Sequence, residues 1–236
     1  MATALLALAG ISACSDGDSV SPLAPPPPPP PTTTFEVTVT NLTNAQPLSP
    51  VGVVVHMDGY TPFAIGVAAS AGLELLAEGG DNSDFLTEAG ADAANMLTAS
   101  GAAPIGPGGS ETISFTIDEA DLPGTQLSVM TMLVNTNDAI SGISAASIEN
   151  MAVGDTVTWR TIAYDAGTEA NTETAATIPG PAGGGEGFNA ARDDREDLVK
   201  MHAGVVSQAD GFMTSDLGEA HRFDNPVAQV TLTRTQ

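Results

Sequence analysis

The sequence predicts an all-β protein, an antiparallel β-sandwich with short helical insertions. Residues 35–40 alternate strictly between apolar and polar side chains, and residues 51–56 are almost continuously apolar, so both segments are expected to be strands. The chain contains 25 Gly and 17 Pro, which favours short elements joined by many turns. There is no regular alternation of strands with helices and no repeat of fixed period, so a sandwich is favoured over a parallel α/β fold.

The other elements follow from the spacing of apolar residues. A short helix is predicted over residues 68–78, where Leu73, Leu76 and Ala77 share one face. A second helix is predicted over residues 84–97, and a Gly/Pro-rich loop follows it. The remaining predictions are strands at 111–117, 126–134, 155–163 and 227–233, a Pro/Gly loop at 178–187 and a short helix at 193–201.

The first residues indicate export from a bacterial cell. Residues 2–10 form an apolar segment that is too short to cross a membrane, and it lacks the positive residues of a typical secretory signal. Residues 11–14, Ile-Ser-Ala-Cys, resemble the lipobox of bacterial lipoproteins, in which the cysteine is acylated. We therefore expect residues 1–13 to be a lipoprotein signal peptide and Cys14 to carry the lipid. By the same resemblance, Ser15 after the cysteine favours the outer membrane. The alternative is an ordinary hydrophobic leader with an incidental cysteine.

The next segment has the composition of a spacer. Residues 25–31 are an unbroken proline run, followed by three threonines. Such a run favours a semi-rigid polyproline II rod. We expect residues 14–34 to form a linker that holds a domain off the membrane, with a ligand for a proline-binding module as the alternative.

The charge balance excludes several partners. The chain has 29 acidic and 6 basic residues, a formal net charge of −23, and no Lys or Arg precedes Arg160. No nucleic acid is expected to bind, because the chain lacks the cations that neutralise phosphates. Anionic lipid surfaces are disfavoured for the same reason, so we expect membrane contact only through the lipid at Cys14.

Five segments, in the correct order, resemble the spondin domain found at the N-terminus of F-spondin and mindin. They are residues 35–50 (a strand and the following turn), 69–81 (ASAGLELLAEGGD), 137–138 (ND), 164–169 (YDAGTE) and 226–234 (PVAQVTLTR). The resemblance implies a spondin domain over residues 35–236. The cysteines of the animal domains are absent, Ala139 and Ile140 replace a Trp-Phe pair, and residues 180–211 have no counterpart that can be aligned.

The resemblance also implies one calcium ion between loops at one end of the sandwich, with carboxylate ligands at Asp138, Asp165 and Glu169. Calcium takes six to eight oxygen ligands from carboxylates, backbone carbonyls and water. Residues 165–169 place two carboxylates in a tight turn around Gly167. Glu169 replaces the family's Asp and has a longer side chain. The alternative is that all three are turn residues of a generally acidic surface.

No catalytic motif is evident. His56, His202 and His221 lack metal-ligand spacing, there is no nucleophile elbow, and Cys14 is the only cysteine. We therefore expect a non-enzymatic, calcium-binding adhesion or recognition domain of the cell envelope or exterior, whose partner is an unidentified extracellular protein or glycan. Two alternatives are an envelope hydrolase that uses Asp165 or Glu169 as general acid or base, and a purely structural envelope protein.

Overall fold

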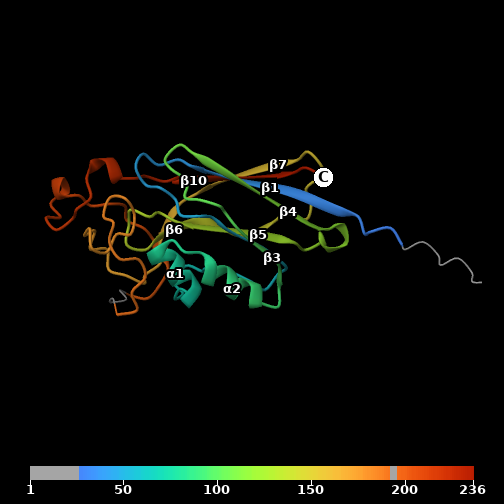
Figure 1. Cartoon of the computed structure of the whole chain (residues 1–236), viewed down its shortest axis with the longest axis horizontal. Coiled ribbons are helices and arrows are strands. Elements are labelled where there is room, and N and C mark those ends of the chain that lie inside the picture. The colour runs from blue at the N-terminus through green and yellow to red at the C-terminus, as the bar shows by residue number, and fades with distance from the viewer. Residues whose placement is uncertain (1–26, 192–195) are drawn as a thin grey trace, which may run out of the picture.

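The computed structural model describes residues 27–191 and 196–236, and the leader and Cys14 lie outside this range. The described chain is an antiparallel β-sandwich, as the sequence predicts, with two short helices on the outside of one sheet (Figure 1). None of its helices has the length and apolar character needed to cross a bilayer.

In the described part of the chain, ten strands form two sheets. The four-stranded sheet has the order β4-β1-β10-β7 and the six-stranded sheet the order β3-β2-β5-β6-β8-β9. The strands of the four-stranded sheet are β1 (Thr32–Asn41), β4 (Ser110–Asp118), β7 (Thr156–Thr161) and β10 (Ala228–Arg234). Those of the six-stranded sheet are β2 (Gly52–His56), β3 (Asn95–Ser100), β5 (Gln126–Met132), β6 (Ala139–Ser147), β8 (Ala163–Asp165) and β9 (Lys200–Met201).

The main core lies between the sheets. The inward residues of β1, namely Phe35, Val37 and Val39, are buried against side chains of both sheets, as their strict alternation predicts. Antiparallel pairing sets β10 beside β1, with Val37 opposite Leu232. The last strand of the chain is therefore central in its sheet.

Helix α1 (Ala71–Gly79) and helix α2 (Ser83–Ala91) cover the outer face of the six-stranded sheet. Leu73 and Leu76 are buried there with Met130 and Ile140. Because β2, β5 and β6 are thus covered on both faces, their sequences do not alternate strictly between apolar and polar residues. Glu88 of α2 accepts the backbone N–H of Gly72 at 2.8 Å, which caps the first turn of α1.

Three predictions of local structure need correction. The helix expected over residues 84–97 ends at Ala91, and β3 begins at Asn95, because the Asp92 carboxylate accepts the N–H of Ala94 at 2.8 Å and turns the chain. The helix expected at 193–201 does not form over 196–201, where Glu196 and Asp197 have positive φ and residues 200–201 are β9. The linker expected to end at residue 34 ends earlier, since β1 begins at Thr32.

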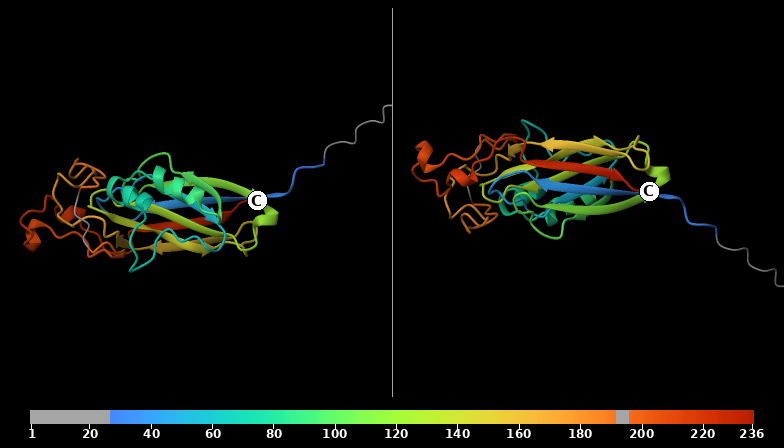
Figure 2. Two further views of the ribbon diagram at one scale, coloured as in Figure 1. Left: turned by 90° about the horizontal axis from the view of Figure 1, so that it is seen from below. Right: turned by 90° about the horizontal axis from the view of Figure 1, so that it is seen from above.

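The two ends of the sandwich differ. The start of the described chain and the C-terminus lie together at one end, and the long loops after β8 gather at the other (Figures 1 and 2). Strand β7 passes directly into β8, so the chain crosses from one sheet to the other at Ile162. This crossover carries the segment 165–169 to the loop-rich end.

Three small 3-10 helices complete the structure. They are η1 (Glu119–Asp121), η2 (Gln208–Asp210) and η3 (Glu219–His221). The long connection between β8 and β10 contains the last two and has its own small core, formed by Ile178, Val205 and Leu217.

Candidate functional site

The sheet register brings the three predicted ligands into one loop cluster. Asp138 directly precedes β6, and Asp165 is the last residue of β8. Because β6 and β8 are antiparallel neighbours with Ala139 opposite Asp165, the two carboxylates lie at adjacent strand ends. Glu169 follows in the turn after β8. All three residues are almost fully buried.

Asp138 fastens this turn to the sheet. Its Oδ2 accepts the backbone N–H groups of Thr168 at 3.0 Å and Glu169 at 3.2 Å. Its other carboxylate oxygen, Oδ1, is buried and has no hydrogen-bond partner among the described residues. One oxygen of Asp138 therefore shapes the backbone, and the other is left to accept a further ligand.

Burial and the nearby charge of Asp165 raise the pKa of Asp138 to about 7, against the opposing effect of the two backbone hydrogen bonds. A buried carboxylate is costly without a positive partner. The electrostatics of the cluster therefore favour a bound cation.

The Asp165 carboxylate is held on both sides. Its Oδ1 accepts the N–H of Gly167 at 2.9 Å, and its Oδ2 accepts the side-chain amide of Asn171 at 2.6 Å. Gly167 has a φ of +77°, and a Cβ there would lie 2.6 Å from the backbone N and O of Leu198. Only glycine fits this close, left-handed position.

The Glu169 carboxylate lies against the same loop cluster. Its Oε1 accepts the side-chain amide of Asn137 at 3.2 Å. Asn137 in turn accepts the N–H of Glu173 through its own Oδ1 at 3.0 Å. The long side chain of Glu169 is therefore directed to Asn137.

A search of the known protein families decides the identity of this fold. The model of the spondin N-terminal domain (Spondin_N) matches residues 40–179. The chain belongs to the spondin N-terminal domain family. A search of the curated proteins found no match.

The spondin match contains the whole loop cluster, since Asp138, Asp165 and Glu169 lie within residues 40–179. The family is one of extracellular recognition and adhesion domains, and it is not a known enzyme family. Strand β10 lies outside the matched range, yet it pairs with both β1 and β7. The C-terminal part of the chain is thus needed to complete the sandwich of this spondin domain.

The structure adds four polar neighbours that the sequence did not single out as ligands: Asn137, Thr168, Asn171 and His202. The hydroxyl of Thr168 is buried without a hydrogen-bond partner among the described residues. His202 Nδ1 accepts the N–H of Gly204 at 2.9 Å, its buried Nε2 has no such partner, and burial lowers the pKa of the ring. Asn137 and Thr168 lie in two of the segments that resemble the family, next to predicted ligands, and that was the signal for them.

The donor chemistry of the cluster suits a hard cation. The cluster contains the buried, unpartnered oxygens Asp138 Oδ1 and Thr168 Oγ1 as well as the Asp165 carboxylate, and calcium prefers oxygen ligands of these kinds. Within residues 27–191 and 196–236, however, no three His, Cys, Asp or Glu side chains converge as a ready metal-binding group.

The buried position bears on the hydrolase alternative. Asp165 is 3% and Glu169 is 3% exposed. The adjoining space, lined in part by Asn137, Asn171 and His202, is too narrow to hold even a water molecule. A glycan or ester that must contact a general acid or base therefore has no open route to these two carboxylates in this conformation.

Proposed function

We propose that this spondin domain is a calcium-stabilised recognition or adhesion domain that acts outside a bacterial cell and is tethered to the envelope by a lipid on Cys14. Family membership supports the extracellular recognition role. The observation that carries the calcium assignment is the buried Asp138 carboxylate, which has an oxygen without a hydrogen-bond partner and lies beside the charged Asp165.

Calcium suits this cluster better than magnesium does. Magnesium demands near-ideal octahedral geometry and retains several waters, whereas calcium accepts irregular shells of six to eight oxygens. The segment 165–169 offers such a shell from a turn, with backbone carbonyls beside the side chains. A cation bound here ties the end of β8 to the start of β6, so its main effect is to fix the loops at this end of the sandwich.

Calcium titration into chelator-treated protein tests this assignment. We expect heat of binding in calorimetry and a rise in melting temperature, because a ligand that binds only the folded state stabilises it, by about 2.7 kcal/mol at 100 times Kd. Asp165→Asn should abolish both effects. Asp84→Asn is the matched control, because it removes one exposed carboxylate from α2 far from the cluster. The absence of both heat and stabilisation in the wild-type protein would overturn the calcium assignment.

The proposed tether follows from the lipobox resemblance and gains support from the position of the linker. Pro27–Pro31 are exposed and lead into β1 at the end of the sandwich opposite the Asp138 cluster. A lipid at Cys14 would therefore leave the calcium cluster facing away from the membrane. Metabolic labelling of the full chain with an alkyne fatty acid in a bacterial host tests the tether. Labelling that disappears in Cys14→Ser supports it, and equal labelling of both proteins contradicts it.

A further inference from the structure

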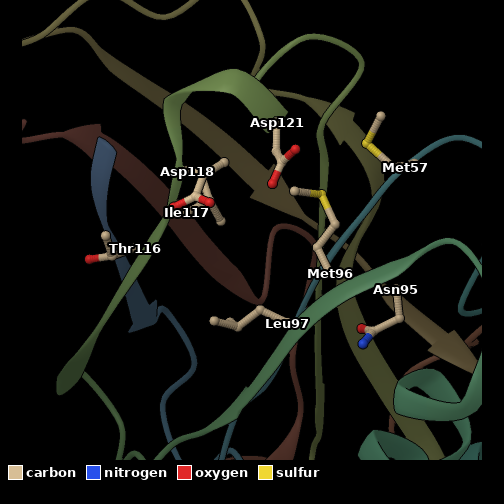
Figure 3. Close-up of a pocket in the computed structure, with 8 residues that line it drawn as sticks. All are labelled: Met57, Asn95, Met96, Leu97, Thr116, Ile117, Asp118 and Asp121. Atoms are coloured by element: carbon tan, nitrogen blue, oxygen red, sulfur yellow. The ribbon is translucent and has the colours of Figure 1, made fainter. Parts of the chain in front are cut away.

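A hollow of about 500 Å³ lies at the open side of the sandwich, far from the Asp138 cluster. It is formed where the edge strand of one sheet faces the edge strand of the other. Residues 95–97 of β3 line one side, residues 116–118 of β4 line the other, and Met57 and Asp121 complete the lining (Figure 3). Its size is within the range of ordinary ligand pockets.

Backbone hydrogen bonds hold both walls. The N–H of Met57 donates to the carbonyl of Ala94 at 2.8 Å on the β3 side, and the N–H of Glu119 donates to the carbonyl of Pro31 at 2.9 Å on the β4 side. Along the chain, the loop at 101–109 connects the two strands at their other ends. The hollow is therefore a built feature of the fold, next to the point where the proline segment enters β1.

The lining combines an apolar floor with an acidic rim. Met96 and Leu97 pack against the main core, and Ile117 belongs to it. Asp118 and Asp121 are exposed, and within the described residues neither carboxylate has a hydrogen bond or an ion pair. The side-chain oxygen of Asn95 is buried there without a hydrogen-bond partner in that same part of the chain. Such a lining fits a ligand that carries a cation beside an apolar group.

Within the described residues, no basic side chain forms an ion pair with Asp118 or Asp121. The chain has 6 basic residues against 29 acidic ones. Three of the basic residues are already paired: Lys200 with Glu196, Arg222 with Asp210, and Arg234 with Glu119. Two copies, each with a net charge of −23, would also repel each other. Charge complementarity thus points to a different, basic molecule.

The free strand edges indicate the form of that molecule. β3 and β4 are the outer strands of their sheets, and an extended peptide can add to such an edge through main-chain hydrogen bonds. We propose that this hollow, the β3/β4 pocket, binds an extended segment of a partner protein that carries Lys or Arg beside branched apolar residues. The apolar side chain lies on Met96, Leu97 and Ile117, and the cation lies between Asp118 and Asp121.

The β3/β4 pocket would be the partner-binding site of the proposed recognition domain, so this inference rests on the proposed function. Its test is nevertheless separate from calcium binding. The probe is a synthetic capped peptide, Thr-Val-Lys-Val-Lys-Val-Thr, compared with the same peptide in which Glu replaces both Lys. Binding is followed at low salt by NMR of ¹³C-labelled methionine methyl groups, because Met57 and Met96 line the pocket and the other five methionines in the described part of the chain do not. Met57→Leu and Met96→Leu assign the two signals.

We expect the Lys peptide to shift the Met57 and Met96 signals selectively and the Glu peptide to shift neither. The double variant Asp118→Asn/Asp121→Asn should weaken binding by roughly tenfold, since partly exposed ion pairs contribute modestly. Glu36→Gln/Asp84→Asn is the matched control: it removes the same charge from exposed sites on β1 and α2 and should bind like wild type.

Three results would overturn the proposal. One is a Lys peptide that leaves Met57 and Met96 unshifted. Another is an equal loss of binding in the pocket and control double variants, which would indicate general attraction to an acidic protein. The third is binding of hexylamine, but not of the Lys peptide, at the two methionines, which would make the pocket a site for small amines. Failure of calcium to bind in the same preparation would refute the calcium assignment alone.

Discussion

The carboxylate of Asp138 accepts the backbone N–H of Glu169 at 3.2 Å. The side chain of one predicted calcium ligand therefore orients the backbone of another, and it does so from the start of a neighbouring strand. Because Asp138 Oδ2 is used in this way and Oδ1 is not, the residue can both shape the turn and contact a cation. The predictions for this end of the sandwich follow from that double role.

Asp138→Asn should stabilise the metal-free protein and should remove the stabilisation by calcium. In the metal-free protein, at a pH above 7, the variant removes a buried charge that repels Asp165, so we expect the free energy of unfolding to rise by on the order of a few kcal/mol. The amide oxygen can still accept the N–H groups of Thr168 and Glu169. Saturating calcium should raise the free energy of unfolding of the wild type but not that of the variant. Urea unfolding in chelator and in calcium measures both effects.

The buried charge of Asp138 should also make the free energy of unfolding of the metal-free protein depend on pH. Burial and Asp165 raise the pKa of Asp138 to about 7 in the folded state, against the ordinary value of 3.8. Between these values the folded state keeps a proton that the unfolded state releases, so the free energy of unfolding falls as pH rises from about 4 to about 7 and is then constant. The contribution is on the order of 4 kcal/mol. Since other carboxylates also titrate, the quantity to measure is the wild-type value minus that of Asp138→Asn. An equal pH slope in both proteins would contradict the prediction.

Gly167→Ala should weaken the domain through its backbone. Alanine at a φ of +77° is strained, and its Cβ would meet the backbone of Leu198 at 2.6 Å. We expect a loss of about 2–4 kcal/mol in urea unfolding. Gly154→Ala is the control, because its φ is +90° but nothing lies within 4 Å of the added Cβ, so that only the conformational cost of about 1 kcal/mol remains. Equal losses in the two variants would mean that the contact with Leu198 does not matter.

How much of the fold the sequence reveals depends on the burial of each strand. β1 is covered on one face only, so its alternation is visible in residues 35–40. β6 lies between β5 and β8 under α1, and its small residues (AISGISAAS) show no alternation, so it was not predicted. β3 was assigned to the preceding helix because Leu97 continues the spacing of Phe85 and Ala89, and only the turn at Asp92 separates them. Where a strand is packed on both faces, its residues no longer alternate between apolar and polar, and the local sequence pattern does not predict it.

The candidate site was predicted from a family resemblance, and the register explains why local reasoning alone would not have found it. Asp138 and Asp165 are far apart in the chain and meet only because Ala139 pairs with Asp165. Sequence spacing does show the tight turn around Gly167, but not that Leu198 packs on it. The β3/β4 pocket was not foreseen at all, because it depends on which strands are left at the sheet edges.

Asn41 provides the last prediction, at the loop that follows β1. Its side-chain amide donates to the carbonyls of Gln46 at 2.8 Å and Ile105 at 2.9 Å, and its Oδ1 accepts the N–H and hydroxyl of Thr43 at 2.9 and 2.8 Å. The residue is fully buried, so all four hydrogen-bonding positions are used inside the protein.

Asn41→Asp should therefore place a buried carboxylate against two carbonyl oxygens. We expect a loss of about 3 kcal/mol or more at pH 7 and a smaller loss at pH 4, where the protonated acid can donate one hydrogen bond. Asn44→Asp makes the same chemical change three residues away at an exposed side chain that donates only to Ala220, at 3.1 Å, and should cost about 0.5 kcal/mol. Thermal melts of both variants at the two pH values decide the matter. If Asn41→Asp were no worse than Asn44→Asp, the Asn41 hydrogen bonds would not be holding this loop, and the connection from β1 toward β2 would depend on its apolar contacts alone.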